Sequence, residues 1–105
     1  MSDTHNAQVL RIYMKESYQY NKMPVYEYLI YEAREREMSG ATLMKAPLGF
    51  GQEERDEGLR YKLSSETPVV LEIVETAEKV AEFLPIVQEA LNGQGLIIQF
   101  GASIR

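Results

Sequence analysis

The order in which two apolar periodicities alternate along the chain constrains the fold more than any other feature. Apolar residues at every second position indicate strands, whereas apolar residues three and four apart indicate amphipathic helices. The strands are expected at residues 9–14, 41–46, 69–75 and either 96–100 or 102–105, and the helices at 24–39 and 77–92. Right-handed crossovers fold this β-α-β-β-α-β order into an α+β ferredoxin-like sandwich. Such a sandwich has a four-stranded antiparallel sheet with both helices on one face.

Turn and cap residues mark the ends of both helices. Pro24 suits the first turn of the first helix, and Gly40 suits a left-handed cap at its end. Thr76 can cap the second helix, which the glycines from Gly93 onward close. Pro85 lies inside the second helix, where it removes a backbone donor and crowds the preceding turn. We therefore predict a kink or a break at Pro85.

The outer face of the predicted sheet carries apolar residues that the two helices do not cover. Val9 and Tyr13 lie on this face in the first strand, and Val70 and Val74 lie on it in the third. An antiparallel sheet with a solvated second face is usually polar there. The pattern therefore predicts that another copy of the chain covers this face. The alternative is a set of individually exposed valines, which are common on monomers.

Length and composition restrict the class of protein. The chain has 105 residues, which suits a single domain over 1–105, and its net charge is −5. Such an acidic chain is a poor candidate for binding nucleic acid or an anionic membrane surface. The absence of cysteine, signal peptide and membrane-spanning apolar run predicts a cytoplasmic protein without membrane insertion. The polar residues 1–7, which include the single histidine His5, are expected to form a disordered tip.

The sequence offers little for catalysis. There is no cysteine, and the single histidine lies in the polar tip, so no nucleophile with a neighbouring base can be assigned. Carboxylates cluster at residues 53–57, where solvated charge is the simpler interpretation and weak Mg²⁺ binding beside a phosphate is the sharper one. We therefore expect a protein that is not an enzyme, with no catalytic residue and no resident metal.

Two glycine-bearing segments are candidates for binding a phosphate, because glycine exposes backbone N–H groups and lets a ligand approach closely. The first consists of Gly49, Phe50, Gly51 and Gln52, followed by the cation Arg55. The second is Gly93-Gln94-Gly95, at the start of the last strand. Neither is a Walker motif or a dinucleotide-binding fingerprint. A flexible strand exit is the alternative interpretation of the first segment.

Three segments follow one another with a spacing that resembles a known superfamily. They read LRIYMKES from Leu10, PVYEYLIYEAREREMSGATLMKAPLGFG from Pro24, and TPVVLEIVETAEKVAEFLPIVQEAL from Thr67. Together with the glycine-bearing end, they resemble the PII-like signalling proteins over nearly the whole chain. The resemblance is strongest to the branch known as domain of unknown function 190. Pro85, which is awkward in a helix, matches the proline of that branch's FLP run.

The resemblance implies a compact homotrimer with adenine nucleotides bound in the clefts between subunits. Carried onto this chain, it implies that Thr42 lies near the adenine and that Gly93 and Gly95 lie at the phosphates. It also implies that Gly49–Gln52 form the base of a T-loop-like segment, which is expected to be mobile over residues 52–67.

The chain departs from the better-known PII proteins mainly in its cations. Arg105 matches the place of their C-terminal arginine. However, Leu96 replaces the lysine after their glycine turn, and no lysine follows Gln52. Because a site with fewer cations holds a triphosphate less well, we expect AMP or ADP rather than ATP, and no sensing of 2-oxoglutarate.

The resulting hypothesis is a regulator in which an adenine nucleotide orders the 52–67 loop, and the loop signals to a partner protein. The resemblance offers a membrane transporter of the fluoride-exporter type as one candidate partner. Two alternatives come from other classes. One is a small enzyme that uses the same clefts between subunits, and the other is an interaction module without a ligand.

Overall fold

The computed structural model describes residues 5–46 and 67–105. The elements within these ranges are β1 (His5–Lys15), β2 (Gln19–Tyr20), β3 (Met23–Pro24), α1 (Val25–Glu35), β4 (Ala41–Lys45), β5 (Pro68–Glu75), α2 (Ala77–Leu91) and β6 (Leu96–Ile104). Several predictions fall on residues 1–4 and 47–66, which lie outside the described residues. They concern the outermost tip, the greater part of the 52–67 loop, and the site residues Gly49, Phe50, Gly51, Gln52 and Arg55.

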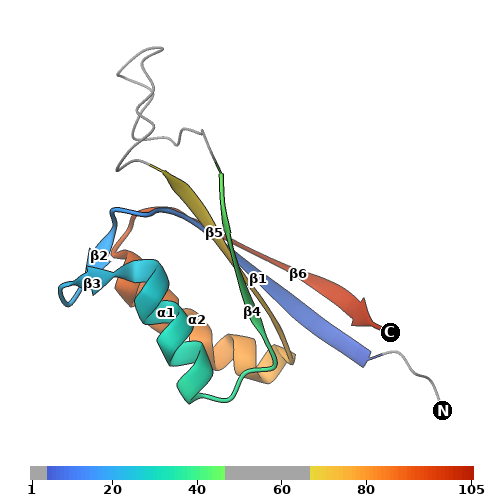
Figure 1. Cartoon of the computed structure of the whole chain (residues 1–105). Helices are drawn as coiled ribbons and strands as arrows, with labels where there is room; N and C mark the ends of the chain where they lie inside the picture. The colour runs from blue at the N-terminus through green and yellow to red at the C-terminus, as the bar shows by residue number, and fades with distance from the viewer. Residues whose placement is uncertain (1–4, 47–66) are drawn as a thin grey trace.

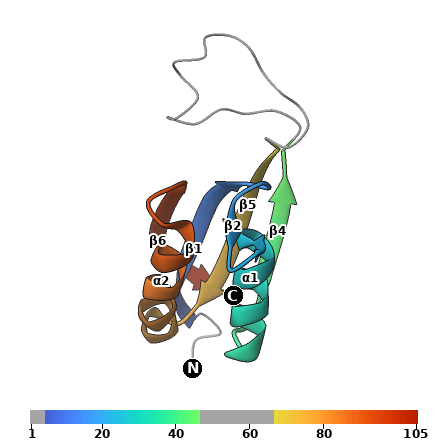
Figure 2. The ribbon, with the colours of Figure 1, turned by 90° about the vertical axis from the view of Figure 1, so that its left-hand side faces the viewer.

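Four of the strands form one antiparallel sheet in the order β4-β5-β1-β6. The strands β1 and β5 are therefore central, and β4 and β6 are the two edges. Both helices pack on the same face of this sheet, as Figures 1 and 2 show from two directions. The predicted ferredoxin-like sandwich of the α+β class is confirmed.

The hydrophobic core lies between the helices and the covered face of the sheet. Successive side chains of a strand point to opposite faces, so the alternation along β1 and β5 sends every second residue inward. Leu10, Ile12 and Leu71 are fully buried on that face. Phe83 and Val87 of α2 complete the same cluster. Burying a side chain of this size stabilises the fold by about 1.5–3 kcal/mol relative to its exposed state.

The first and last strands pair over a longer stretch than the sequence predicted. β1 begins at His5, and residues 5–7, which were assigned to the disordered tip, pair with residues 102–104 of β6. β6 is continuous over Leu96–Ile104 and so includes most of both alternative segments for the last strand. The antiparallel ladder provides backbone partners for the polar residues at the start of β1, which composition alone does not reveal.

The segment between β1 and α1, for which the sequence predicts no helix or strand, contains a small hairpin of β2 and β3. Its turn residues Asn21 and Lys22 have positive φ angles of 50° and 68°, as a type I′ turn requires. The hairpin places the ring of Tyr20 beside that of Tyr28 in α1, with centroids 4.7 Å apart. The Tyr20 hydroxyl donates a hydrogen bond to Glu89 of α2. The hairpin therefore links both helices.

The end of α1 differs from the prediction. Glu37, and not Gly40, has the left-handed conformation, with φ of 53°. The N–H of Met38 donates to the carbonyl of Ala33 at 3.1 Å, which is the long bond of a Schellman motif. Met38 packs against the core in the same motif. The predicted glycine cap is wrong because the packing of Met38 ends the helix before the chain reaches Gly40.

The start of α2 agrees with the prediction, and the helix does not break in its interior. Thr76 has an extended backbone, and its hydroxyl accepts a hydrogen bond of 3.3 Å from the N–H of Lys79. The helix is continuous through Pro85, so of the two predicted outcomes the break is wrong and the kink stays a prediction. Proline removes the bond to the carbonyl of Ala81, and both residues are exposed, so water can replace the lost donor.

Replacing Thr76 with alanine is expected to lower the free energy of unfolding by about 1 kcal/mol, because it removes the side-chain acceptor of the α2 cap. Thr76→Ser keeps the hydroxyl oxygen and is the matched control, with almost no loss. Urea unfolding at one fixed protein concentration measures both variants. Equal stabilities of the alanine and serine variants would show that the cap contributes nothing.

Candidate functional site

The ends of β4 and β5 form a well-connected base for the segment that joins them. The N–H of Ala46 donates to the carbonyl of Pro68 at 3.0 Å, and the N–H of Glu16 donates to the carbonyl of Thr67 at 2.8 Å. The Glu16 side chain also accepts a hydrogen bond of 2.6 Å from Lys45 Nζ, which raises the pKa of Lys45. β4, β5 and the residue after β1 are thus joined where the chain leaves for residue 47.

Thr42, the predicted adenine contact, lies on the edge strand β4 and is exposed. It pairs with Glu72 of β5, and both side chains point to the face of the sheet without helices. Its hydroxyl is therefore available at an edge of the sheet, where a neighbouring molecule can approach it.

The turn after α2 requires glycine at two positions because of its backbone conformation. Gly93 and Gly95 have φ angles of +84° and +75°, which side-chain-bearing residues rarely adopt. A Cβ atom on Gly95 would lie 2.5 Å from the carbonyl oxygen of Tyr13, whereas one on Gly93 would meet no atom within 4 Å. Gly95 thus allows β6 to pack closely on β1. The turn lies at the β6 edge, opposite the edge that carries Thr42.

A single copy of the chain does not bring the predicted nucleotide contacts together. Thr42 on β4 and the Gly93–Gly95 turn at β6 are separated by the width of the two central strands, about 14 Å at the usual spacing of 4.8 Å. Arg105 follows β6 at its far end, about 30 Å along the strand from Gly95 at the usual rise per residue. One ligand can contact all of them only where different copies meet.

The sheet face without helices, which we call the open face, is largely apolar. Its residues are Ala7, Val9, Arg11, Tyr13, Lys15, Thr42, Met44, Pro68, Val70, Glu72, Val74, Leu96, Ile98, Phe100, Ala102 and Ile104, by register and alternation. Leu96 is 57% exposed and Met44 45% exposed, so large apolar side chains reach solvent at both edges. The predicted outward placement of Val9, Tyr13, Val70 and Val74 is confirmed.

An ion pair lies at the centre of the open face. Arg11 on β1 is opposite Glu72 on β5. Its Nε and Nη2 donate to the same carboxylate oxygen, Glu72 Oε2, at 2.9 and 2.6 Å. The side-chain hydrogen bond with Glu72 raises the pKa of Arg11. The guanidinium also lies 5.1 Å from the ring centroid of Phe100 on β6, a cation–π distance. The pair thus ties three strands together on one face.

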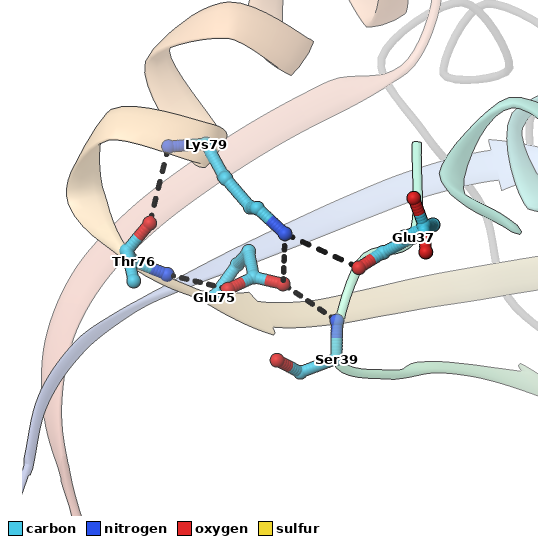
Figure 3. A network of polar contacts seen from close by, with 5 residues as sticks. All are labelled: Glu37, Ser39, Glu75, Thr76 and Lys79. Carbon is cyan, nitrogen blue, oxygen red and sulfur yellow. Dashed lines mark hydrogen bonds and ion pairs between the residues drawn. The ribbon is translucent and has the colours of Figure 1, made fainter. Parts of the chain in front are cut away.

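A buried carboxylate joins three elements at the opposite end of the sheet from the 47–66 connection. Glu75, the last residue of β5, accepts hydrogen bonds from the N–H groups of Ser39 and Thr76 at 2.5 and 2.9 Å (Figure 3). Lys79 lies 3.9 Å from the same carboxylate and donates to the Glu37 carbonyl. Burial alone would raise the pKa of Glu75, but the hydrogen bonds from Ser39 and Thr76 and the charge of Lys79 together outweigh it, so the pKa is lowered.

Residues 5–46 and 67–105 contain no group of three or more His, Cys, Asp or Glu side chains placed to hold a metal ion. Within the same ranges, no helix is long and apolar enough to cross a membrane. The arrangement offers surfaces for binding, in the form of two sheet edges and an apolar face.

Comparison with known families decides the classification. The model of the DUF190 family, described as "Uncharacterized ACR", matches residues 7–102. The chain belongs to the DUF190 family. A UPF0166 protein of Aquifex aeolicus is 36% identical over 86 residues, which cover 81% of this chain and 82% of the relative. A UPF0166 protein of Methanocaldococcus jannaschii is 30% identical over 92 residues, covering 88% and 85%. The sequence resemblance to this branch is confirmed.

Solved structures of PII-like proteins share the fold of this DUF190 chain. CPII of Thiomonas intermedia, a nitrogen regulatory PII-like protein bound to ADP, AMP and bicarbonate, has a TM-score of 0.70 at 12% identity, covering 98% and 97% of the two chains. A PII-like signalling protein of Thermus thermophilus has a TM-score of 0.62 at 18% identity, covering 98% and 91%. The Bacillus subtilis GlnK–ATP complex has a TM-score of 0.54 at 14% identity, covering 92% and 82%.

Sequence reasoning did not find two of the polar features, although a signal for one of them was present. Arg11 and Glu72 each stand between apolar outward residues in their own strands, so the sequence places both charges on the outward face, although it does not show that they pair. Their pairing across 61 residues depends on the β1–β5 register. Glu75 gave no such signal, because its partners are backbone N–H groups, which every sequence contains.

Proposed function

We propose that this DUF190 protein is a regulator, and not an enzyme, that assembles into a homotrimer and binds AMP or ADP between its subunits. The nucleotide would order the 52–67 loop, and the loop would then signal to a partner protein. The fold shared with CPII, which binds ADP and AMP, supports the ligand class. The shared fold with GlnK, which was solved with ATP, supports the same class of ligand.

The open face supports self-assembly through its charge as well as its apolar surface. The chain carries a net charge of −5, so most pairs of its surfaces repel one another. Within the described residues, the charged members of the open face are Arg11 and Glu72, which compensate each other, and Lys15 at the end of β1, so this face carries none of the chain's net negative charge. Two copies can therefore approach through this face without repulsion between negative charges, and they bury the exposed apolar edges when they do.

The placement of Thr42 and the glycine turn at opposite edges of one sheet is the observation that carries the proposal. A ring of copies related by rotation joins one surface patch of a subunit to a different patch of the next. In such a ring the β4 edge of one copy can meet the β6 edge of its neighbour. Thr42 and the Gly93–Gly95 turn then reach one ligand from two subunits, as residues of a shared cleft.

The remaining parts of the proposal concern the phosphates and the partner. Gly49, Phe50, Gly51, Gln52 and Arg55 are proposed as contacts from the base of the loop, and Arg105 as a contact from the C-terminal end. The few cations favour AMP or ADP over ATP, and Mg²⁺ would accompany the phosphates only weakly. We propose a membrane ion exporter as the first partner to test, because the family resemblance points to that class.

Titration calorimetry with AMP, ADP and ATP tests the ligand, and sedimentation velocity tests the trimer. Thr42→Val removes the hydroxyl at nearly constant volume and is expected to weaken AMP or ADP binding roughly tenfold. Ser103→Ala removes a hydroxyl from β6 and is the matched control, with affinity unchanged. Unchanged affinity of Thr42→Val contradicts the site, and no binding of any nucleotide by wild type contradicts the function. Consumption of the nucleotide in chromatographic assays would favour the enzyme alternative.

A further inference from the structure

The Arg11–Glu72 ion pair lies where a second copy would cover the open face. Arg11 and Glu72 belong to the two central strands, so any copy that covers the open face also covers them. Their side chains are 33% and 27% exposed in the single chain, so water still reaches both. Assembly would remove this water from both charges.

The energetic effect of this removal depends on where the neighbouring copy docks. Desolvating an ion pair costs free energy that its mutual attraction offsets only when the remaining hydrogen-bonding groups are also satisfied. Here Nε and Nη2 of Arg11 both donate to Glu72 Oε2, and within residues 5–46 and 67–105 no hydrogen bond reaches Glu72 Oε1. An arrangement of copies that leaves this oxygen dry and unpaired is penalised, however well the apolar residues pack.

A second copy of the same chain carries groups that can satisfy the pair. Its own open face presents a guanidinium that donates, together with the hydroxyls of Tyr13 and Thr42. The surrounding apolar residues tolerate sliding, because apolar contacts are not directional. The ion pair is directional, so only certain positions of the neighbour provide a donor to Glu72 Oε1.

We propose that the Arg11–Glu72 ion pair selects the arrangement in which copies of this chain assemble through the open face. This inference rests on the homotrimer of the proposed function. In this role the pair is a determinant of specificity: apolar residues such as Leu96 and Phe100 drive assembly, while the pair excludes neighbours in other positions. Single polar groups in apolar interfaces set register and oligomeric state in the same way in coiled coils.

The experiment compares three variants of the whole chain with wild type. Arg11→Met leaves Glu72 without its partner. The double variant Arg11→Met/Glu72→Leu replaces the pair with apolar residues of similar size. The matched control Glu32→Leu/Arg36→Met removes another ion pair, which joins Arg36 Nη1 to Glu32 Oε1 at 2.8 Å at the end of α1, on the other side of the sheet from the open face (Figure 1). Native mass spectrometry and sedimentation velocity over a dilution series report oligomeric state and affinity, and circular dichroism reports folding.

The expected results distinguish the affinity of assembly from the choice of one arrangement of copies. Arg11→Met is expected to weaken assembly at least tenfold, because it leaves a carboxylate unpaired in the closing interface. The double variant is expected to assemble at least as tightly as wild type but into more than one oligomeric species. The control is expected to match wild type in both respects.

A double variant that forms one species, the same as wild type, overturns the inference even if Arg11→Met fails to fold. A folded Arg11→Met variant that assembles with wild-type affinity also overturns it. A wild-type chain that stays monomeric throughout the dilution series contradicts the proposed homotrimer itself, and the inference falls with it. The first two outcomes leave the homotrimer intact, so failure of the inference is distinguishable from failure of the proposed function.

Discussion

Gly95→Ala is expected to lower the free energy of unfolding by about 3 kcal/mol, because the alanine would have to adopt a left-handed φ and its Cβ would collide with a neighbouring strand. The φ angle of +75° disfavours any residue with a side chain. The new Cβ would also lie 2.5 Å from the carbonyl oxygen of Tyr13 and 3.4 Å from Cδ2 of Leu91. The Tyr13 oxygen belongs to the backbone of the central strand β1, so it cannot move aside as the end of a flexible side chain can.

Gly93→Ala is the matched control, because it shares the left-handed φ but meets no atom within 4 Å. It is expected to cost about 1 kcal/mol, from the backbone conformation alone. Urea unfolding at one fixed protein concentration measures both, since assembly makes apparent stability depend on concentration. Equal losses in the two variants would show that the close approach of β6 to β1 contributes nothing at Gly95.

Glu75→Gln is expected to cost about 2 kcal/mol near neutral pH, because an amide can accept only one of the two backbone hydrogen bonds that the carboxylate accepts. Its NH₂ group would face the N–H of Ser39 or of Thr76, which are both donors. The loss also includes the interaction with Lys79. Together these contacts hold the turn before β4 on the start of α2 (Figure 3).

The stability that Glu75 provides to the folded chain decreases as the pH falls. Its pKa in the folded chain is lowered from the usual 4.5, so the folded state favours the ionised form. The stability it provides is complete above the usual pKa and is lost as the pH falls through the lowered value. The difference in stability between wild type and Glu75→Gln should therefore shrink on acidification below that usual value. Glu78→Gln, an exposed change in the first turn of α2, is the control. A difference that stays constant with pH contradicts the assigned role of the carboxylate.

Some local features of the fold could be predicted from the sequence, and others could not. The cap at Thr76 was predictable because a hydroxyl before an apolar helical stripe has a local function. The hairpin at residues 19–24 was missed because Asn21-Lys22 is not one of the usual glycine-containing turns. The end of α1 was misplaced because Met38 packs on a core that forms only when the sheet is present.

The residues of the candidate site could likewise be predicted from the sequence, but their positions in the sheet could not. Thr42 and the glycines of the Gly93–Gly95 turn could be named from sequence, because glycine-rich turns and a resemblance to PII-like proteins both point to them. Their position on opposite edges of the sheet follows from the strand order, which places β5 and β1 between them. That the proposed site requires a second copy of the chain therefore follows from the strand order.

By itself, the sequence determined the class of the fold, the inward and outward faces of the strands, and the apolar character of the open face. These properties follow from local periodicity, because the side-chain period of a strand is two and that of a helix is 3.6. Only the tertiary structure decided that Arg11 meets Glu72, that Glu75 holds Ser39, and that Gly95 must approach Tyr13. Each of these contacts joins residues far apart in the chain, and strand register and packing bring them together.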